Sequence, residues 1–149
     1  MGVLGIDIPE SQIRIIPAGL SKQETLETLI DAVCTNPMIP DAELFKRAVF
    51  EREGVSSTGI GGGIAIPHVR LEGLPSPTLG IAVAHEGVDF DTLDNDPVYV
   101  LVLFATPKDA DKTYLSLLAQ VMIALRDIDL FEKLSACRTV KEVHALVKG

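Results

Sequence analysis

Near the N-terminus, the pattern of apolar and polar positions changes from that of a strand to that of a helix. The stretch "IRII" at Ile13–Ile16 has strand character. Ser21 then begins a helix, because Ser21 and Glu24 form the S-x-x-E pattern of a capping box. The apolar positions that follow recur at helical spacing: Leu26, Leu29, Ile30 and Val33. We therefore expect one strand and then one helix that buries this stripe.

A second helical pattern runs from about Asp41 to Arg52, after a stretch that two prolines interrupt. Its apolar stripe consists of Phe45, Ala48 and Val49. The i, i+3, i+4, i+7 series from Phe45 continues to Arg52, so a guanidinium lies at the C-terminal edge of the buried face. Two interpretations stay open at this point. Arg52 complements the helix C-terminus, or it serves a site beside the glycine-rich loop that follows.

The middle of the chain contains three apolar segments that predict strands. A short strand covers Ile64–Ile66 and ends at Pro67 and His68. Two longer segments, "TLGIAVA" at Thr78–Ala84 and "VYVLVLFA" at Val98–Ala105, predict two more. The last of these is apolar throughout, which is typical of a central strand that helices cover on both faces.

The remainder of the chain predicts three helices. Their approximate bounds are Asp109 or Asp111 to Arg126, Leu130 to Ala136, and Thr139 to Val147. In the first of them, the positions predicted to face inward are Leu115, Leu118, Met122 and Leu125. The order of strands and helices along the chain predicts an α/β fold, with a mixed β-sheet flanked by helices on both faces.

Composition agrees with one cytoplasmic domain. A chain of 149 residues, 47% of them apolar, suits a single core, so we expect one domain that spans residues 1–149. No segment has the roughly 18 unbroken apolar residues of a membrane span, and the N-terminus lacks the basic region of a signal peptide. The two cysteines form no CxxC pair and fit a reducing compartment. We expect a cytoplasmic protein without direct membrane insertion.

The net charge of the chain limits which classes of macromolecule are expected as partners. The net charge of −8 and the isoelectric point of about 4.8 describe a surface that repels phosphate backbones, so nucleic acid is not expected as a partner. The same surface suits a docking protein with a basic face, although acidity for solubility alone explains it equally well.

The stretch "STGIGGGIAIPHVR", Ser57 to Arg70, holds the densest cluster of candidate functional residues. It is neither a P-loop nor a dinucleotide fingerprint, because the spacing of glycines fits neither motif. Glycines at this density let successive backbone N–H groups face an anion, and the alternative is a flexible turn. The candidates for phosphate binding are Thr58, Gly59, Gly61, Gly62 and Gly63.

His68 closes this stretch and is the candidate nucleophile. A neutral imidazole is a good nucleophile near pH 7, because its unperturbed pKa is about 6.5. Pro67 stiffens the approach to it, and a histidine that ends a strand is presented at the edge of the sheet. Outside such a context, a lone histidine is more often a surface or core residue. His85 and His144 have no such context and are expected to be structural or solvent-facing.

Three other kinds of chemistry lack their sequence patterns. The acidic run Asp89–Asp96 departs from the spacing of an EF-hand, and we interpret it as a solvated turn. The three histidines are dispersed without metal-ligand spacing, so no metal is expected. Ser57 near His68 suggests a hydrolase only weakly, because G-x-S-x-G is absent.

Nearly the whole chain resembles one known family. "EREGVSSTGIGGGIAIPHVRLEG" is similar to the signature of enzyme IIA domains of the bacterial sugar phosphotransferase system, of the fructose/mannitol type that includes the nitrogen-regulatory enzyme IIA. "LSKQETLETLIDAV" looks like the first helix of that family. "VDFDTLDNDPVYVLVLFATPKDADKTYLSLLAQV" looks like its later strands and helix.

The resemblance implies a function and its residues. It implies that His68 is phosphorylated by the histidine phosphocarrier protein, and that Arg52 and Glu53 match the "RE" pair of the family. It further implies that the phosphoryl group passes to a cysteine of a sugar-specific IIB domain or, in the regulatory branch, serves as a signal to target proteins. No cofactor is implied. Tyr114 stands where family members commonly carry a second active-site histidine.

Tyr114 keeps two alternatives open. A tyrosine hydroxyl can donate a hydrogen bond to phosphate, but it cannot carry the positive charge of an imidazolium. The function expected from the resemblance is a phosphocarrier in sugar uptake. The alternative is a nitrogen-regulatory IIA-like protein whose phosphorylation state at His68 controls partner binding. A scaffold that no longer accepts phosphate is a third alternative.

Overall fold

A computed structural model describes residues 4, 6–55, 57–92, 94–109 and 111–148, so the ends of the predicted domain lie outside the described residues. Six strands form one sheet within this part of the chain: β1 (Ile13–Ile15), β2 (Gly59–Gly61), β3 (Ile64–Ala65), β4 (His68–Leu71), β5 (Thr78–Val88) and β6 (Val98–Pro107). The helices are η1 (Glu10–Gln12, a 3-10 turn), α1 (Lys22–Val33), α2 (Ala42–Val55), α3 (Asp111–Arg126), α4 (Ile128–Ser135) and α5 (Val140–Val147).

The sheet is mixed, as predicted. Its centre is the antiparallel pair β5 and β6, and β1 lies parallel to β5 at one side. On its other side β6 is parallel to β3 and, further along, to β4, while β2 is antiparallel to β3. The apolar segment expected to be central is indeed β6, which pairs with strands on both of its edges.

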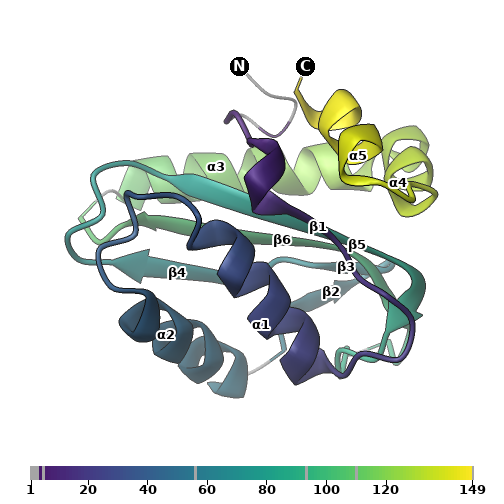
Figure 1. Cartoon of the computed structure of the whole chain (residues 1–149), viewed down its shortest axis with the longest axis horizontal. Coiled ribbons are helices and arrows are strands. Elements are labelled where there is room, and N and C mark those ends of the chain that lie inside the picture. Colours follow the sequence, from purple (N-terminus) through teal and green to yellow (C-terminus); the bar gives the residue numbers. More distant parts are fainter. Residues whose placement is uncertain (1–3, 5, 56, 93, 110, 149) are drawn as a thin grey trace.

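Helices cover both faces of this sheet (Figure 1). The helices α1 and α2 pack on one face, and Leu101 and Leu103 of β6 belong to their cluster. The helices α3, α4 and α5 pack on the other face, over the alternating β6 positions Val100, Val102 and Phe104. The predicted α/β class, with helices on both faces of a mixed sheet, is confirmed.

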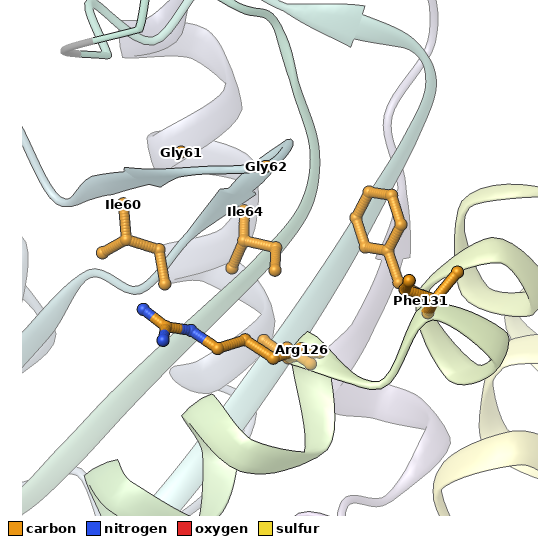
Figure 2. A pocket seen from close by; sticks show the side chains of 8 residues that line it. Ile60, Gly61, Gly62, Ile64, Arg126 and Phe131 are labelled. Atoms are coloured by element: carbon orange, nitrogen blue, oxygen red, sulfur yellow. The ribbon is translucent and has the colours of Figure 1, made fainter.

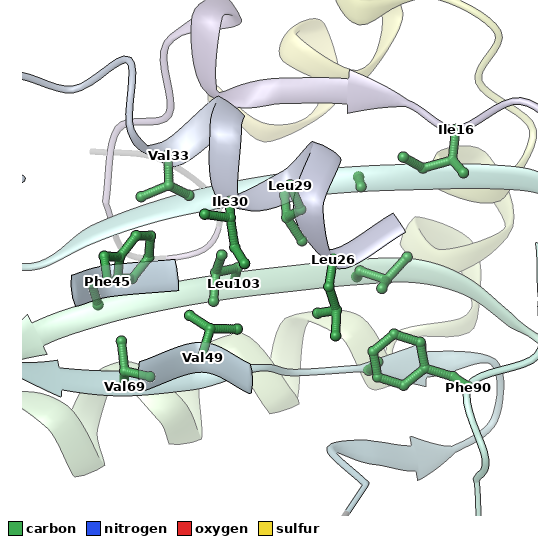
Figure 3. Packing of buried hydrophobic residues seen from close by; sticks show 14 of the residues in the cluster. Ile16, Leu26, Leu29, Ile30, Val33, Phe45, Val49, Val69, Phe90 and Leu103 are labelled. Atoms are coloured by element: carbon green, nitrogen blue, oxygen red, sulfur yellow. The ribbon is translucent and has the colours of Figure 1, made fainter. Parts of the chain in front are cut away.

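The first helix forms for the reasons its sequence gives. The side chain of Ser21 accepts the Glu24 N–H, and the Glu24 carboxylate accepts the Ser21 N–H in return, which completes the predicted capping box. The predicted stripe of α1 is buried and points at the sheet (Figure 3): Leu26, Leu29, Ile30 and Val33. Burying such side chains contributes about 1.5–3 kcal/mol each, so packing and not helix propensity anchors α1.

The predicted strand Ile64–Ile66 forms as β3 and stops at Ala65, but the prediction that His68 closes that strand is wrong. Ala65 and His68 pair with Leu101 and Phe104, so β3 and β4 form one interrupted line along β6. Pro67 causes the interruption because it has no N–H for the ladder, although its carbonyl still accepts the Phe104 N–H at 3.1 Å. His68 therefore begins a strand, at the end of the interruption.

One inward position predicted for the third helix is also wrong. Leu115 is 59% exposed, whereas Leu117, Val121 and Leu125 form the buried face of α3. Residues four apart lie on one side of a helix, and Leu115 is displaced from that series by roughly a third of a turn. Leu125 is buried as predicted. No helix in the described part of the chain has the length and apolar character needed to cross a membrane.

Two glycine-to-alanine substitutions are expected to change stability in opposite directions. A Cβ at Gly80 of β5 would lie 2.5 Å from Val33 Cγ2 and 3.2 Å from the Gln12 carbonyl oxygen, so G80A destabilises by about 1–3 kcal/mol through overpacking. A Cβ at Gly54, within α2, meets nothing within 4 Å, so G54A stabilises by about 0.5–1 kcal/mol. Chemical denaturation of both variants measures the difference, and equal effects would contradict the close α1–β5 contact.

Candidate phosphoryl-transfer site

His68 lies in an open hollow of about 440 Å³ where both helical layers reach the free edge of β4. The lining residues come from three elements: Ala48, Glu51, Arg52 and Val55 of α2, His68, Val69 and Arg70 of β4, and Tyr114 of α3. The structure thus brings together His68, Arg52 and Tyr114, three of the residues singled out in the sequence.

The His68 imidazole is held by one ring nitrogen. Its Nδ1 lies 2.8 Å from the carbonyl oxygen of Ile66. A carbonyl can only accept, so Nδ1 carries the proton and the lone pair of the neutral ring is on Nε2. The local backbone therefore selects the tautomer whose Nε2 is nucleophilic.

Aromatic rings fix the plane of the imidazole. The ring stacks on buried Phe104, with centroids 5.3 Å apart and 19° between planes. The Tyr114 ring is tilted against it at 5.6 Å, and the Arg70 guanidinium lies 4.4 Å from the centre of the Tyr114 ring. The imidazole therefore contacts both aromatic rings, and Tyr114 positions a cation close by.

The electrostatic setting keeps His68 neutral. Partial burial lowers the pKa of His68 below its usual value, and the positive charges of Arg52 and Arg70 lower it further. The hydrogen bond to the Ile66 carbonyl and the negative charge of Glu53 act in the opposite direction without reversing the shift. Near neutral pH the ring is therefore unprotonated at Nε2 and available as a nucleophile.

This lowered pKa predicts a pH dependence of stability. Below about pH 6.5 the unfolded chain binds a proton at His68 that the native state binds only at lower pH. The free energy of unfolding should therefore fall as the pH decreases from about 6.5 to the native pKa, and His68 should have no effect above that range. Denaturation of wild type and H68Q across this range measures it, and identical pH slopes would contradict the shift.

Glu53 and Thr58 form a buried hydrogen-bonded network, and neither residue lines the hollow at His68. The Glu53 carboxylate accepts the Thr58 N–H at 2.9 Å and the Thr58 hydroxyl at 2.7 Å. The Lys22 ammonium lies 2.8 Å from the same carboxylate. Thr58, predicted to bind phosphate, therefore directs both donors at a protein carboxylate in this structure.

The predicted glycine cluster forms a hairpin whose tip faces a different hollow. Gly59 and Gly61 belong to β2, which turns through Gly62 and Gly63 into β3. Figure 2 shows Gly61 and Gly62 with Ile60 and Ile64 across from Arg126 and Phe131, which line a hollow of about 370 Å³. None of its lining residues lines the hollow at His68.

The backbone conformation of the turn explains why glycine occupies each of its positions. Gly61, Gly62 and Gly63 have φ of 87°, 66° and 82°, which side chains rarely adopt. A Cβ at Gly63 would also lie 2.9 Å from Phe131 and 3.0 Å from Tyr99.

Part of the acidic run holds the hairpin tip. Asp94 accepts the Gly62 N–H at 3.2 Å and the Thr92 hydroxyl at 2.8 Å. Hydrogen bonds from the Thr92 side chain and the Asp96 N–H lower the pKa of Asp94. A phosphate-binding role for the glycines stays a prediction, and it requires the Gly62 N–H to exchange the carboxylate for phosphate.

Sequence patterns missed Arg70, Phe104 and Lys22. Arg70 carried a usable signal, because polar and apolar positions alternate from His68 through Val69 to Arg70, as in a strand with one exposed face. Phe104 and Lys22 carried none, since their contacts with the site depend on the register of β4 on β6 and on how α1 packs.

Comparisons with known proteins point to one family. Residues 8–149 match the model of the family described as "Phosphoenolpyruvate-dependent sugar phosphotransferase system, EIIA 2". A fructose-specific EIIA component of Haloferax volcanii is 32% identical over 85% of this chain and 84% of its own length. A nitrogen regulatory protein of Pseudomonas aeruginosa is 35% identical over 93% of this chain and 90% of its own.

Solved structures share the fold. The nitrogen regulatory protein IIA-Ntr from Neisseria meningitidis has a TM-score of 0.81 at 26% identity, over 93% of this chain and 94% of that one. The IIA mannitol protein from Escherichia coli has a TM-score of 0.78 at 20% identity, over 95% and 99% of the two chains.

Proposed function

Because the chain belongs to the EIIA 2 family of the phosphoenolpyruvate-dependent sugar phosphotransferase system, we propose that His68 is its phosphoryl acceptor. The donor is the histidine phosphocarrier protein, and the acceptor is a cysteine of a IIB domain in sugar uptake. The observation that carries this proposal is the contact between His68 Nδ1 and the Ile66 carbonyl, since it leaves Nε2 nucleophilic beside Arg52.

The transfer is a single in-line displacement at phosphorus. The Nε2 lone pair of His68 forms the new N–P bond, while the N–P bond of the donor phosphohistidine breaks and its electron pair returns to the donor ring. His68 keeps its proton on Nδ1, at the Ile66 carbonyl, so the phosphorylated ring is cationic. The donor ring, which carries a proton on its second nitrogen, leaves as a neutral imidazole, and no proton has to move.

Positive charge in the hollow stabilises the moving phosphoryl group. Arg52 and Arg70 line the hollow from α2 and β4. Guanidinium groups form charge-assisted hydrogen bonds with phosphoryl oxygens and stabilise the charge that spreads over them in the transition state. We assign Arg52 to this role, whereas both Thr58 donors are bonded to Glu53 and the tip of the glycine hairpin lines the other hollow.

Labelling tests the proposed acceptor. The purified protein is incubated with phosphorylated histidine phosphocarrier protein, and the phosphopeptide is located by mass spectrometry. We expect an acid-labile, base-stable phosphate on His68 alone. Phosphate on His85 or His144, or no uptake at all, would overturn the proposal.

The second candidate function is regulation, in which phosphorylation of His68 switches the binding of partner proteins. It is favoured by the likeness to nitrogen regulatory proteins and by Tyr114 in place of a second histidine. Adding a IIB domain to the phosphorylated protein separates the two functions. Rapid discharge supports the transport function, whereas phosphate that persists supports regulation.

A further inference from the structure

We propose that Glu53 is a positioning residue for the transfer, acting through Thr58 and Ile66 to fix the orientation and tautomer of the His68 ring. The inference rests on the proposed function, because it concerns the same imidazole. It differs from that proposal in assigning a role to a buried carboxylate that lines no part of the hollow at His68.

Glu53 is built into the protein as an anion. Its side chain is 5% exposed and has the Lys22 ammonium at 2.8 Å. Its two oxygens also accept the Thr58 N–H and the Thr58 hydroxyl, so its donors come from α1 and from the start of the hairpin. A buried carboxylate with three donors holds them rigidly, because losing any of them leaves charge without compensation.

A continuous path leads from this carboxylate to the imidazole. The Thr58 carbonyl accepts the Ile66 N–H at 3.1 Å, and the Ile66 carbonyl accepts His68 Nδ1–H at 2.8 Å. Pro67 has no N–H. The Ile66 N–H is therefore the last donor before His68 that can form a hydrogen bond to the β2 side, and its acceptor is the Thr58 carbonyl. Glu53 therefore holds Thr58, Thr58 holds Ile66, and Ile66 holds the ring.

The charge of Glu53 acts on the same ring. It raises the pKa of His68 against the lowering effect of Arg52. The phosphorylated ring carries a positive charge with its proton on Nδ1, and a nearby fixed anion favours that state over the neutral one. Position and charge therefore act together, which a purely structural tie between α2 and the hairpin would not require.

The test uses E53Q, a nearly isosteric change that removes the charge. Nitrogen NMR of the unphosphorylated wild type should report one tautomer, protonated at Nδ1. In E53Q we expect both tautomers, a lower His68 pKa, and a rate of phosphorylation reduced about tenfold. The matched control is E86Q, which removes the same charge from an exposed position of β5 and should match wild type in all three measurements.

A second pair of variants covers the case in which E53Q fails to fold. T58V removes only the hydroxyl bond to Glu53, whereas T58S keeps it. We expect an intermediate mixture of tautomers and an about threefold slower rate in T58V, with both restored in T58S. Unchanged tautomer and rate in E53Q, or equal behaviour of T58V and T58S, would overturn the proposal.

The two proposals fail in distinguishable ways. The tautomer and the pKa are measured on unphosphorylated protein, so they report on Glu53 even if His68 accepts no phosphate. If wild type takes up no phosphate while E53Q still changes the tautomer, the proposed function fails and Glu53 still positions the ring. If wild type is labelled and E53Q leaves the ring unaltered, only the positioning role fails.

Discussion

We expect H68A to take up no phosphate from the phosphorylated histidine phosphocarrier protein and wild type to be labelled. Alanine removes the only atom that forms the new bond, Nε2, and no neighbouring side chain in the hollow offers an equivalent nucleophile. The Tyr114 hydroxyl is a poor substitute, because a tyrosine hydroxyl is a much weaker nucleophile than a neutral imidazole. The loss should therefore be complete within the sensitivity of labelling.

H144A is the matched control for H68A. His144 lies on α5, with its Nδ1 3.8 Å from a Glu10 carboxylate oxygen. It lines neither the hollow at His68 nor the hollow at the hairpin tip. H144A should be labelled like wild type, and circular dichroism should show that both variants are folded. Full labelling of H68A would overturn the assignment of the nucleophile.

R52A should slow phosphorylation of His68 about 100-fold, which is the second largest effect that we expect. Removing one charged donor from a site where negative charge is redistributed in the transition state typically has an effect of this size. R52K should recover part of the rate, because it keeps the charge but loses the planar pair of donors.

The pH of the measurement separates two effects of R52A. Arg52 also lowers the pKa of His68, so its removal raises that pKa. At about pH 8 the ring is neutral in both proteins, and the rate difference there reports on the phosphoryl group alone. On the acid side, R52A should lose activity at a higher pH than wild type.

R47A is the matched control for R52A, because Arg47 is exposed on the same helix, away from the lining of the hollow. R47A should be phosphorylated at a rate within about twofold of that of wild type, because surface substitutions usually have small effects. A rate for R52A that equals that of R47A would show that the guanidinium in the hollow has no part in the transfer.

The sequence by itself determined those features that depend only on the residue pattern within one helix or strand. The capping residues and stripe of α1 and the uninterrupted apolar run of β6 were readable, because burial repeats every 3.6 or 2 residues within one element. The position of Arg52 followed from the same periodicity, continued by one step from Phe45. Pro67 and His68 were readable as a special site for a related reason, since proline restricts its neighbours without tertiary help.

Only the tertiary structure decided which of these residues meet. His68 and Phe104 are 36 positions apart and stack because β4 resumes pairing with β6 after Pro67. The glycines looked like neighbours of His68 in sequence, yet the hairpin carries its tip to a separate hollow. Two further outcomes have the same physical cause. The Thr58 hydroxyl donates to Glu53, and Leu115 is exposed to solvent. Periodicity defines a face of an element, but the register and packing of other elements decide what that face meets.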